Sequence, residues 1–151
     1  MSTRRMRGRG IVHGTATGIA LVSPEAISFL GDLDIRTGRV VNATLTLHGQ
    51  SVAGRVLVIP HSVGSAGAWR FLYQLFVHGT NPSAIVSQAL PDSSLVQGAI
   101  LAQVPLVCEL EGSGIATLRT GDELTVDGTA GVVTVVAGSD MDTRVRRPLR
   151  S

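Results

Sequence analysis

Short runs of apolar and β-branched residues alternate with glycine-rich, polar stretches along most of the chain. Runs of this length, bounded by turn-forming residues, are typical of β-strands. Residues 55–59 are apolar at every position after Arg55, which predicts a strand buried on both faces. The other predicted strands are residues 11–12, 17–22, 83–87, 106–108, 123–126 and 131–136.

A helical pattern occupies residues 66–78. Its apolar residues recur at i, i+3, i+4 and i+7, so on an α-helix they share one face. These residues are Trp69, Leu72, Tyr73 and Phe76. We expect this face to pack in the core, and Gly79 to follow the end of the helix.

The order of the elements predicts the fold class. An apolar run at residues 95–102 predicts a second, shorter helix between two strands. Strands that alternate with helices predict parallel pairing and right-handed crossovers. Asp127-Gly128 separates the last two predicted strands, which indicates an antiparallel hairpin. The prediction is therefore an α/β fold with a C-terminal β-hairpin.

The pattern is weaker between residues 23 and 54. Glycine, aspartate and threonine at residues 29–38 indicate a loop. Residues 24–28 are expected to form one helical turn. Residues 39–47 alternate only in part, but their valines and threonines favour a strand.

The candidate functional residues lie in the loop between the strand at 55–59 and the following helix. Gly64 and Gly67 allow a sharp turn and leave room for a ligand. Ser62 and Ser65 supply hydroxyl groups where the helix begins, and a helix N-terminus attracts anions such as carboxylates. Serine is also a preferred N-cap residue, so the pattern alone leaves open that Ser65 only caps the helix.

Length and composition indicate one folded domain, because 44% of the 151 residues are hydrophobic and 16% are charged. Four arginines in the first ten residues give that segment a charge of +4, and the last ten carry +3. The remaining residues carry −5. We therefore expect basic flexible tails at residues 1–10 and 139–151 around a domain at 11–138. An acidic body and tails without interleaved aromatic residues argue against nucleic acid as a partner.

Several other classes of function are not expected. Cys108 is the only cysteine, so the chain cannot form an internal disulfide or ligate an iron–sulfur cluster by itself. Apolar runs are too short to span a membrane, and no apolar block follows the N-terminal arginines as in a secretory signal. The expected location is the cytoplasm.

The order and spacing of several short motifs resemble the small subunit of aconitase X-type dehydratases, whose fold is a swivelling β/β/α domain. The matching segments are residues 27–31, 34–38, 47–59, 64–65, 79–86, 98–102, 120–122 and 126–128. The resemblance covers about residues 18–136. The family usually has Gly-Gly where this chain has Gly31-Asp32, and a less hydrophobic run where it has Ser62-Val63.

The resemblance implies a hydro-lyase subunit that works with a larger subunit carrying an iron–sulfur cluster and most of the substrate pocket. The swivel domain would close over that pocket and present its Gly-Ser loop to a small hydroxy-acid substrate. Ser65 maps to the serine that removes a proton or holds a carboxylate, with Ser62, Gly64 and Gly67 as substrate-binding neighbours. Of the substrates that the family implies, cis-3-hydroxy-L-proline is favoured by an arginine-rich, lysine-free composition. Mevalonate 5-phosphate is the alternative.

Two functions from other classes remain as alternatives. The residue 120–128 hairpin also resembles the mobile domain of phosphoenolpyruvate-using enzymes, which carry a phosphohistidine. His13 and His61 are the candidates for that role, although neither lies in the sequence context of that family. A non-catalytic scaffold subunit is the third interpretation.

Overall fold

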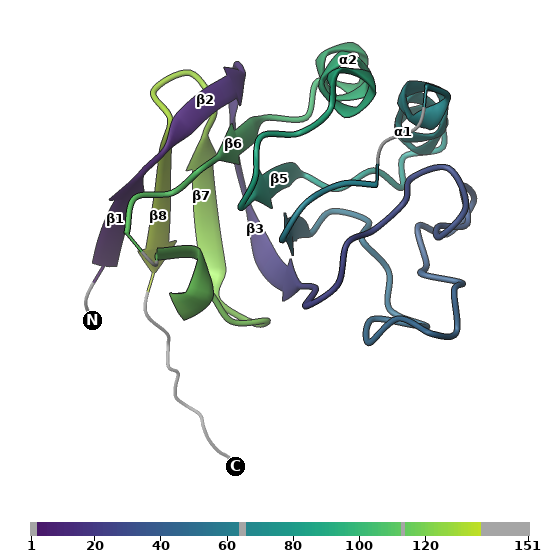
Figure 1. The fold of residues 1–151 in the computed structure, drawn as a ribbon, viewed down its shortest axis with the longest axis horizontal. Coiled ribbons are helices and arrows are strands. Elements are labelled where there is room, and N and C mark those ends of the chain that lie inside the picture. The colour runs from purple at the N-terminus through teal and green to yellow at the C-terminus, as the bar shows by residue number, and fades with distance from the viewer. Residues whose placement is uncertain (1–2, 64–65, 113, 137–151) are drawn as a thin grey trace.

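The computed structural model describes residues 3–63, 66–112 and 114–136. They form β-strands packed on one side by two helices (Figure 1). The eight strands have the order β1-β8-β7-β3-β4-β5-β6-β2. Their bounds are β1 Thr3–Arg7, β2 Arg9–Val12, β3 Thr15–Val22, β4 Val56–Ile59, β5 Ala84–Ser87, β6 Leu106–Cys108, β7 Glu123–Asp127 and β8 Val132–Val136.

The sheet has a parallel part and an antiparallel part. Strands β3, β4, β5 and β6 pair in parallel, in the order in which they occur in the chain. Strands β7 and β8 form the predicted hairpin, and β7 pairs antiparallel with β3. Both the parallel strand–helix units and the C-terminal hairpin were predicted from the sequence. The α/β prediction is therefore confirmed.

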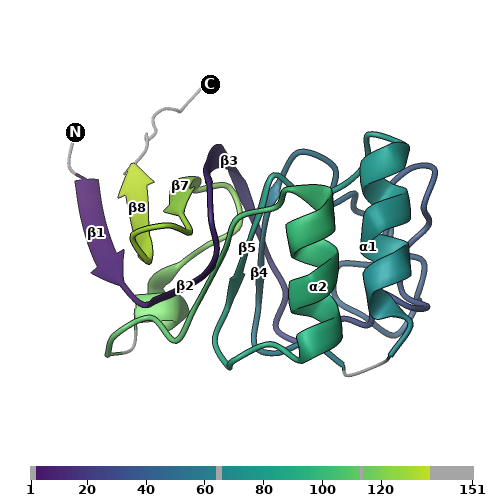
Figure 2. The same ribbon diagram turned by 90° about the horizontal axis from the view of Figure 1, so that it is seen from above.

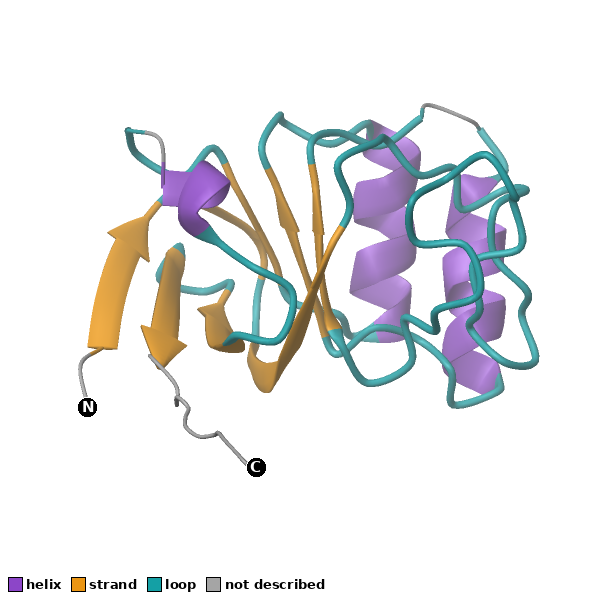
Figure 3. Ribbon diagram, turned by 90° about the horizontal axis from the view of Figure 1, so that it is seen from below, coloured by secondary structure: helices purple, strands orange, loops and turns teal. Residues whose placement is uncertain are grey.

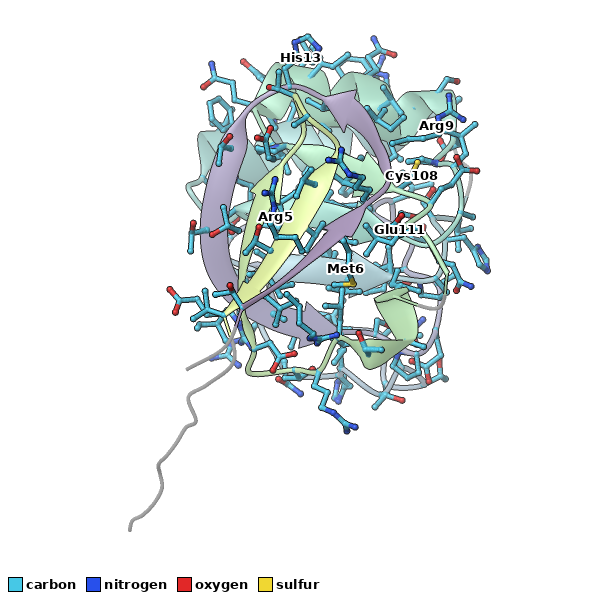
Figure 4. All side chains as sticks on the ribbon, turned by 90° about the vertical axis from the view of Figure 1, so that its left-hand side faces the viewer. Arg5, Met6, Arg9, His13, Cys108 and Glu111 are labelled. Atoms are coloured by element: carbon cyan, nitrogen blue, oxygen red, sulfur yellow. The ribbon has the colours of Figure 1, made fainter. Side chains whose placement is uncertain are left out.

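Strands β1 and β2 close the sheet on itself. They lie at opposite ends of the strand order, yet only Gly8 separates them in the sequence. Strand β1 pairs with β8 and β2 pairs with β6, so one bent segment joins the two edges. Figure 4 looks onto this segment and shows Arg5, Met6 and Arg9 along it. The two edge strands of the sheet are thus consecutive parts of one segment, and a sheet closed in this way offers less free edge for association with other chains.

The N-terminal boundary expected at residue 11 is corrected by this closure. Residues 3–10 belong largely to β1 and β2, and Met6 is buried inside the barrel. The arginines of β1 point away from the core, as the exposed positions around Met6 show. The strand is stabilised by pairing with β8, whose residues lie more than 120 positions away. Residues 139–151 lie outside the described part of the chain.

Two apolar cores lie on opposite faces of the parallel strands. Alternate residues such as Val56 and Val58 point into the barrel, where they meet residues of β7 and β8. Leu57 and Ile59, the residues between them, point toward the helices. All four are almost fully buried. A strand with a core on each face must be apolar at every position, as predicted for residues 55–59 after Arg55.

Helices α1 (Ala68–Val77) and α2 (Ser93–Ala102) lie side by side over one face of the sheet (Figure 2). They approach closely at Gly98, where a Cβ atom would lie 2.9 Å from Trp69 Cα. The fully buried residues of α1 are Ala68, Leu72 and Leu75. Tyr73 is 37% exposed. The expected core face is therefore wrong for Tyr73, whereas Leu72 is buried and Phe76 is partly buried against the core as expected. Apolar residues cover a broad arc of α1, and its fully buried side is the aliphatic one.

A segment without regular structure connects β3 to β4 (Figure 3). The strand expected at residues 39–47 is not formed, and only Arg39 and Val40 make isolated bridges. The Asn42 side chain instead accepts the Thr44 N–H and donates to Asp32. Such side-chain bonds stabilise turns at the expense of a strand. Residues 24–28 do not form the expected helical turn, since Ile27 bridges to Ser62.

No helix among the described residues is long and apolar enough to cross a membrane.

Candidate functional site

The loop that follows β4 lies at the carboxyl edge of the parallel strands. Ala89, just beyond the end of β5, donates its N–H to the Pro60 carbonyl, so the loops after β4 and β5 run together. Val63 donates its N–H to the Ile27 carbonyl on the other side. In open α/β sheets, ligands bind outside the carboxyl ends of the strands. The fold therefore places the predicted loop where such sheets bind ligands.

Asp92 anchors the first half of this loop. The Ser62 hydroxyl donates to Asp92 Oδ1 at 2.6 Å, the length of a strong charge-assisted hydrogen bond. Asp92 is also the N-cap of α2, and its Oδ2 accepts from the N–H groups of Ser94 and Leu95. One carboxylate thus ties the loop after β4 to the start of α2.

Ser94 anchors the second half. The N-cap residue of α1 is Gly67, which makes no side-chain cap hydrogen bond. The Ser94 hydroxyl of α2 takes that role, because it accepts the Trp69 N–H at 3.1 Å. It also donates to the Ala66 carbonyl at 3.3 Å. Residues on both sides of positions 64 and 65 are therefore held by the first turn of α2.

The predicted site residues have different outcomes. Ser62 and Gly67 lie in this loop as expected. Ser65, the predicted catalytic residue, and Gly64 lie outside the described residues, so their roles remain predictions. Gly67 occupies the N-cap position of α1, two residues after Ser65. The alternative in which Ser65 only caps the helix also remains a prediction, because Ser65 lies outside the described residues.

Sequence reasoning missed Asp92 and Ser94. A signal for Asp92 was present, since an aspartate directly before a predicted helix is a typical N-cap. Its bond to Ser62 had no local signal, because 30 residues separate the two. Ser94 caps a helix other than its own, which only the packing of α1 on α2 brings about.

Large apolar side chains are exposed around the same loop. Val63 is 44% exposed and Leu90, in the adjacent loop, is 53% exposed. Leu30 is 43% exposed, and its Cδ1 lies 3.5 Å from where a Cβ on Gly67 would be. A hollow of about 200 Å³ lies beside the first residue of the loop, between Ser23, Pro60 and Gln88. Several large apolar side chains exposed around one loop are typical of a surface that binds a partner or ligand.

Replacing Asp92 by alanine should destabilise the protein, because it removes an N-cap and the bond from Ser62. We expect the free energy of unfolding to fall by about 1–3 kcal/mol, measured by urea denaturation. Asp92→Asn is the matched control, since the asparagine oxygen is an equally good cap and its amide N–H can donate to the Ser62 hydroxyl oxygen instead. It should cost less than about 1 kcal/mol. Equal losses in the two variants would mean that charge, rather than the hydrogen bonds, accounts for the effect.

The described residues do not fit an iron–sulfur cluster. Cys108 is fully buried between the sheet and the helices. Burial raises the pKa of its thiol, Glu109 adds to the rise and Arg9 opposes it, so the thiol is neutral at neutral pH. Within residues 3–63, 66–112 and 114–136, no three histidine, cysteine or acidic residues come together as metal ligands.

The two histidines of the phosphohistidine alternative lie at opposite edges of the sheet. His61 belongs to the loop after β4, with its Nδ1 3.3 Å from the Ser62 carbonyl oxygen. His13 lies in the turn between β2 and β3, at the other end of the barrel (Figure 4).

A family model described as the aconitase X swivel domain matches residues 5–135. The chain belongs to this family. The match includes most of β1, which agrees with the corrected N-terminal boundary and not with a tail at residues 1–10.

Curated relatives from archaea are similar over nearly their whole length. The phosphomevalonate dehydratase small subunit of Methanocella arvoryzae is 40% identical over 129 residues, which cover 85% of this chain and 97% of the relative. That of Methanosarcina acetivorans is 39% identical over 132 residues, covering 87% and 91%. In the crystal structure of holo-form aconitase X from Thermococcus kodakaraensis, one chain superposes with a TM-score of 0.83 at 34% identity. The superposition covers 89% of this chain and 99% of that one.

Proposed function

We propose that this chain is the small subunit of a dehydratase that acts on mevalonate 5-phosphate. The main support is the 40% identity to a phosphomevalonate dehydratase small subunit, matched over 97% of its length. The names of the relatives favour this substrate over cis-3-hydroxy-L-proline, which the composition favoured. They also favour a dehydratase over a phosphohistidine carrier or a scaffold subunit.

The proposed partner is a large aconitase X-type subunit, which would hold the iron–sulfur cluster that the family implies. The exposed side chains of Leu30, Val63 and Leu90 surround the loop after β4 and give an apolar surface for docking. Docking there would bring the loop over a pocket that the large subunit contributes. Closure of a domain over a pocket excludes water and completes a catalytic site.

Ser65 is the proposed catalytic residue of this chain. Dehydration breaks a C–H and a C–O bond, and a serine oxygen can take the proton only if its negative charge is stabilised. The N-terminal end of α1 carries the positive end of the helix dipole, which suits a serine alkoxide or a substrate carboxylate. Arg70 adds a cation in the first turn of α1, with its guanidinium carbon 5.3 Å from the centre of the Trp69 ring. A nearby cation also suits a phosphate-bearing substrate.

Reconstitution with the large aconitase X-type subunit of the same organism tests the proposal. The complex should form water-eliminated product from mevalonate 5-phosphate, detected by mass spectrometry, and each subunit alone should form none. Turnover of cis-3-hydroxy-L-proline instead would keep the dehydratase role and overturn the substrate. Failure of the two chains to associate would overturn both.

A pair of arginine substitutions tests the docking surface in the same assay. Leu90→Arg places a charge in the proposed apolar surface and should weaken association at least 10-fold, as measured by titration calorimetry. Val77→Arg is the control, since Val77 is 58% exposed on α1 and away from the loop. It should leave association unchanged. An equal effect of the two substitutions would argue that docking uses another face.

A further inference from the structure

A second hollow lies at the opposite edge of the parallel strands. Its volume is about 570 Å³, within the range of small-molecule sites. Its lining includes the β2–β3 turn, Ser83 before β5, Pro105 before β6, and Ile100 and Gln103 at the end of α2. The four residues of β5 span roughly 13 Å, at about 3.3 Å per residue, and the hollow and the loop after β4 lie at opposite ends of this length. The hollow is therefore distinct from the site proposed above.

Ser83 gives this hollow an unmet hydrogen-bonding group. Its Oγ is buried, and among the described residues it has no hydrogen-bond partner. A buried hydroxyl without a partner is unusual in a native protein and costs free energy unless something binds it. The Oγ lies beside Gly18, 2.7 Å from where a Cβ on that glycine would be. Because Ser83 also lines the hollow, rotation of its side chain would turn this hydroxyl toward a molecule bound there.

Fixed backbone holds the walls in place. Gln103 ends α2 in the left-handed region with φ 58°, and its N–H donates to the carbonyls of Ala99 and Ile100. Glycine or asparagine adopts this left-handed conformation at a lower cost in free energy than glutamine does. Across the hollow, the Gly14 N–H donates to the Thr129 hydroxyl and its carbonyl accepts the Gly128 N–H. The hollow is thus preformed, which lowers the entropic cost of binding.

The lining determines the chemical class of ligand. Its polar side chains are those of His13, Thr15, Ser83 and Gln103, all of which can donate a hydrogen bond. The described lining contains no carboxylate to bind a cation. Ile100 and Pro105 contribute apolar walls. We propose that this hollow binds a small molecule with an apolar body and one hydrogen-bond-accepting oxygen group, such as a short aliphatic carboxylate.

Titration of the full-length chain with hexanoate, followed by amide NMR spectra, tests the site. We expect saturable shifts at residues 13–16, 83 and 100–105, and none with hexylammonium, which has the same chain and the opposite charge. Absence of saturation, or equal binding of hexylammonium, would overturn the proposal.

Three variants locate the binding. Ser83→Ala should weaken hexanoate binding about 2- to 10-fold, the value of one hydrogen bond, without lowering the melting temperature. Ile100→Glu should weaken it at least 10-fold by charge repulsion. Leu101→Glu is the matched control, because Leu101 is also exposed on α2 but does not line the hollow. An effect of Leu101→Glu equal to that of Ile100→Glu would place binding elsewhere.

A binding experiment on the complex tests whether this site is separate from the subunit interface. Hexanoate should bind the complex with the large subunit as it binds the chain alone, without competing with mevalonate 5-phosphate. Loss of binding in the complex would show that the partner covers the hollow, and would overturn the small-molecule site while leaving the proposed dehydratase function standing.

Discussion

Replacing Ser65 by alanine is expected to lower turnover of the reconstituted complex by roughly 10²-fold or more, the typical contribution of a general acid or base. Folding and association should be nearly unaffected, because even the loss of a helix cap costs no more than about 0.5–2 kcal/mol. Turnover is measured with saturating mevalonate 5-phosphate, and association by calorimetry. A loss confined to KM would indicate that Ser65 binds the substrate carboxylate and does not take the proton.

Ser62→Ala is the matched control for this prediction. The Ser62 hydroxyl donates to Asp92, so its removal should cost stability, about 1 kcal/mol, more than turnover. Full activity of Ser65→Ala would leave this serine without a catalytic role. It would not affect the proposed binding of carboxylates at the opposite edge, since that hollow does not include Ser65.

Replacing Gly128 by alanine is expected to give the largest loss of stability. At this point the turn between β7 and β8 crosses the β1–β2 segment with backbone against backbone. A Cβ on Gly128 would collide with the Val12 carbonyl oxygen, and one on Gly10 with the Gly128 carbonyl oxygen. The Gly8 N–H donates to the Gly131 carbonyl at 2.7 Å in the same crossing. Neither backbone can move without opening the barrel.

We expect Gly128→Ala to lower the free energy of unfolding by about 3 kcal/mol or more, measured by urea denaturation. Gly31→Ala is the control, because a Cβ there meets nothing within 4 Å and the residue has no positive φ. It should change stability by less than about 0.5 kcal/mol. If Gly128→Ala yields too little folded protein for denaturation, the yields of soluble protein of the two variants are compared instead. Gly128→Ala should then give much less soluble protein than Gly31→Ala. Equal stability of the two variants would contradict the role of the crossing.

The local pattern of the sequence was enough to place the elements that have a strong apolar signal. Residues 55–59 were predicted to be buried on both faces after Arg55, and all four residues of β4 are buried. The helix predicted at 66–78 corresponds to α1, and that at 95–102 to α2. Asp127-Gly128 marked the hairpin of β7 and β8. In these segments the local preference and the final packing agree, which is why pattern alone sufficed.

Tertiary structure decided the features that depend on distant parts of the chain. Strand β1 is rich in exposed arginine and becomes a strand only through its pairing with β8. The core face of α1 is selected by its contact with α2, and the glycine crossing at Gly128 requires two segments far apart in sequence.

The candidate site divides in the same way. The sequence identified the loop with Ser62 and Gly67, because proline, glycine and serine between a strand and a helix have local conformational meaning. It could not identify Asp92 or Ser94 as the groups that hold this loop, since their hydrogen bonds span 25 to 30 residues. Such bonds arise only after the parallel strands have brought their carboxyl ends, and the loops that follow them, to one edge of the sheet.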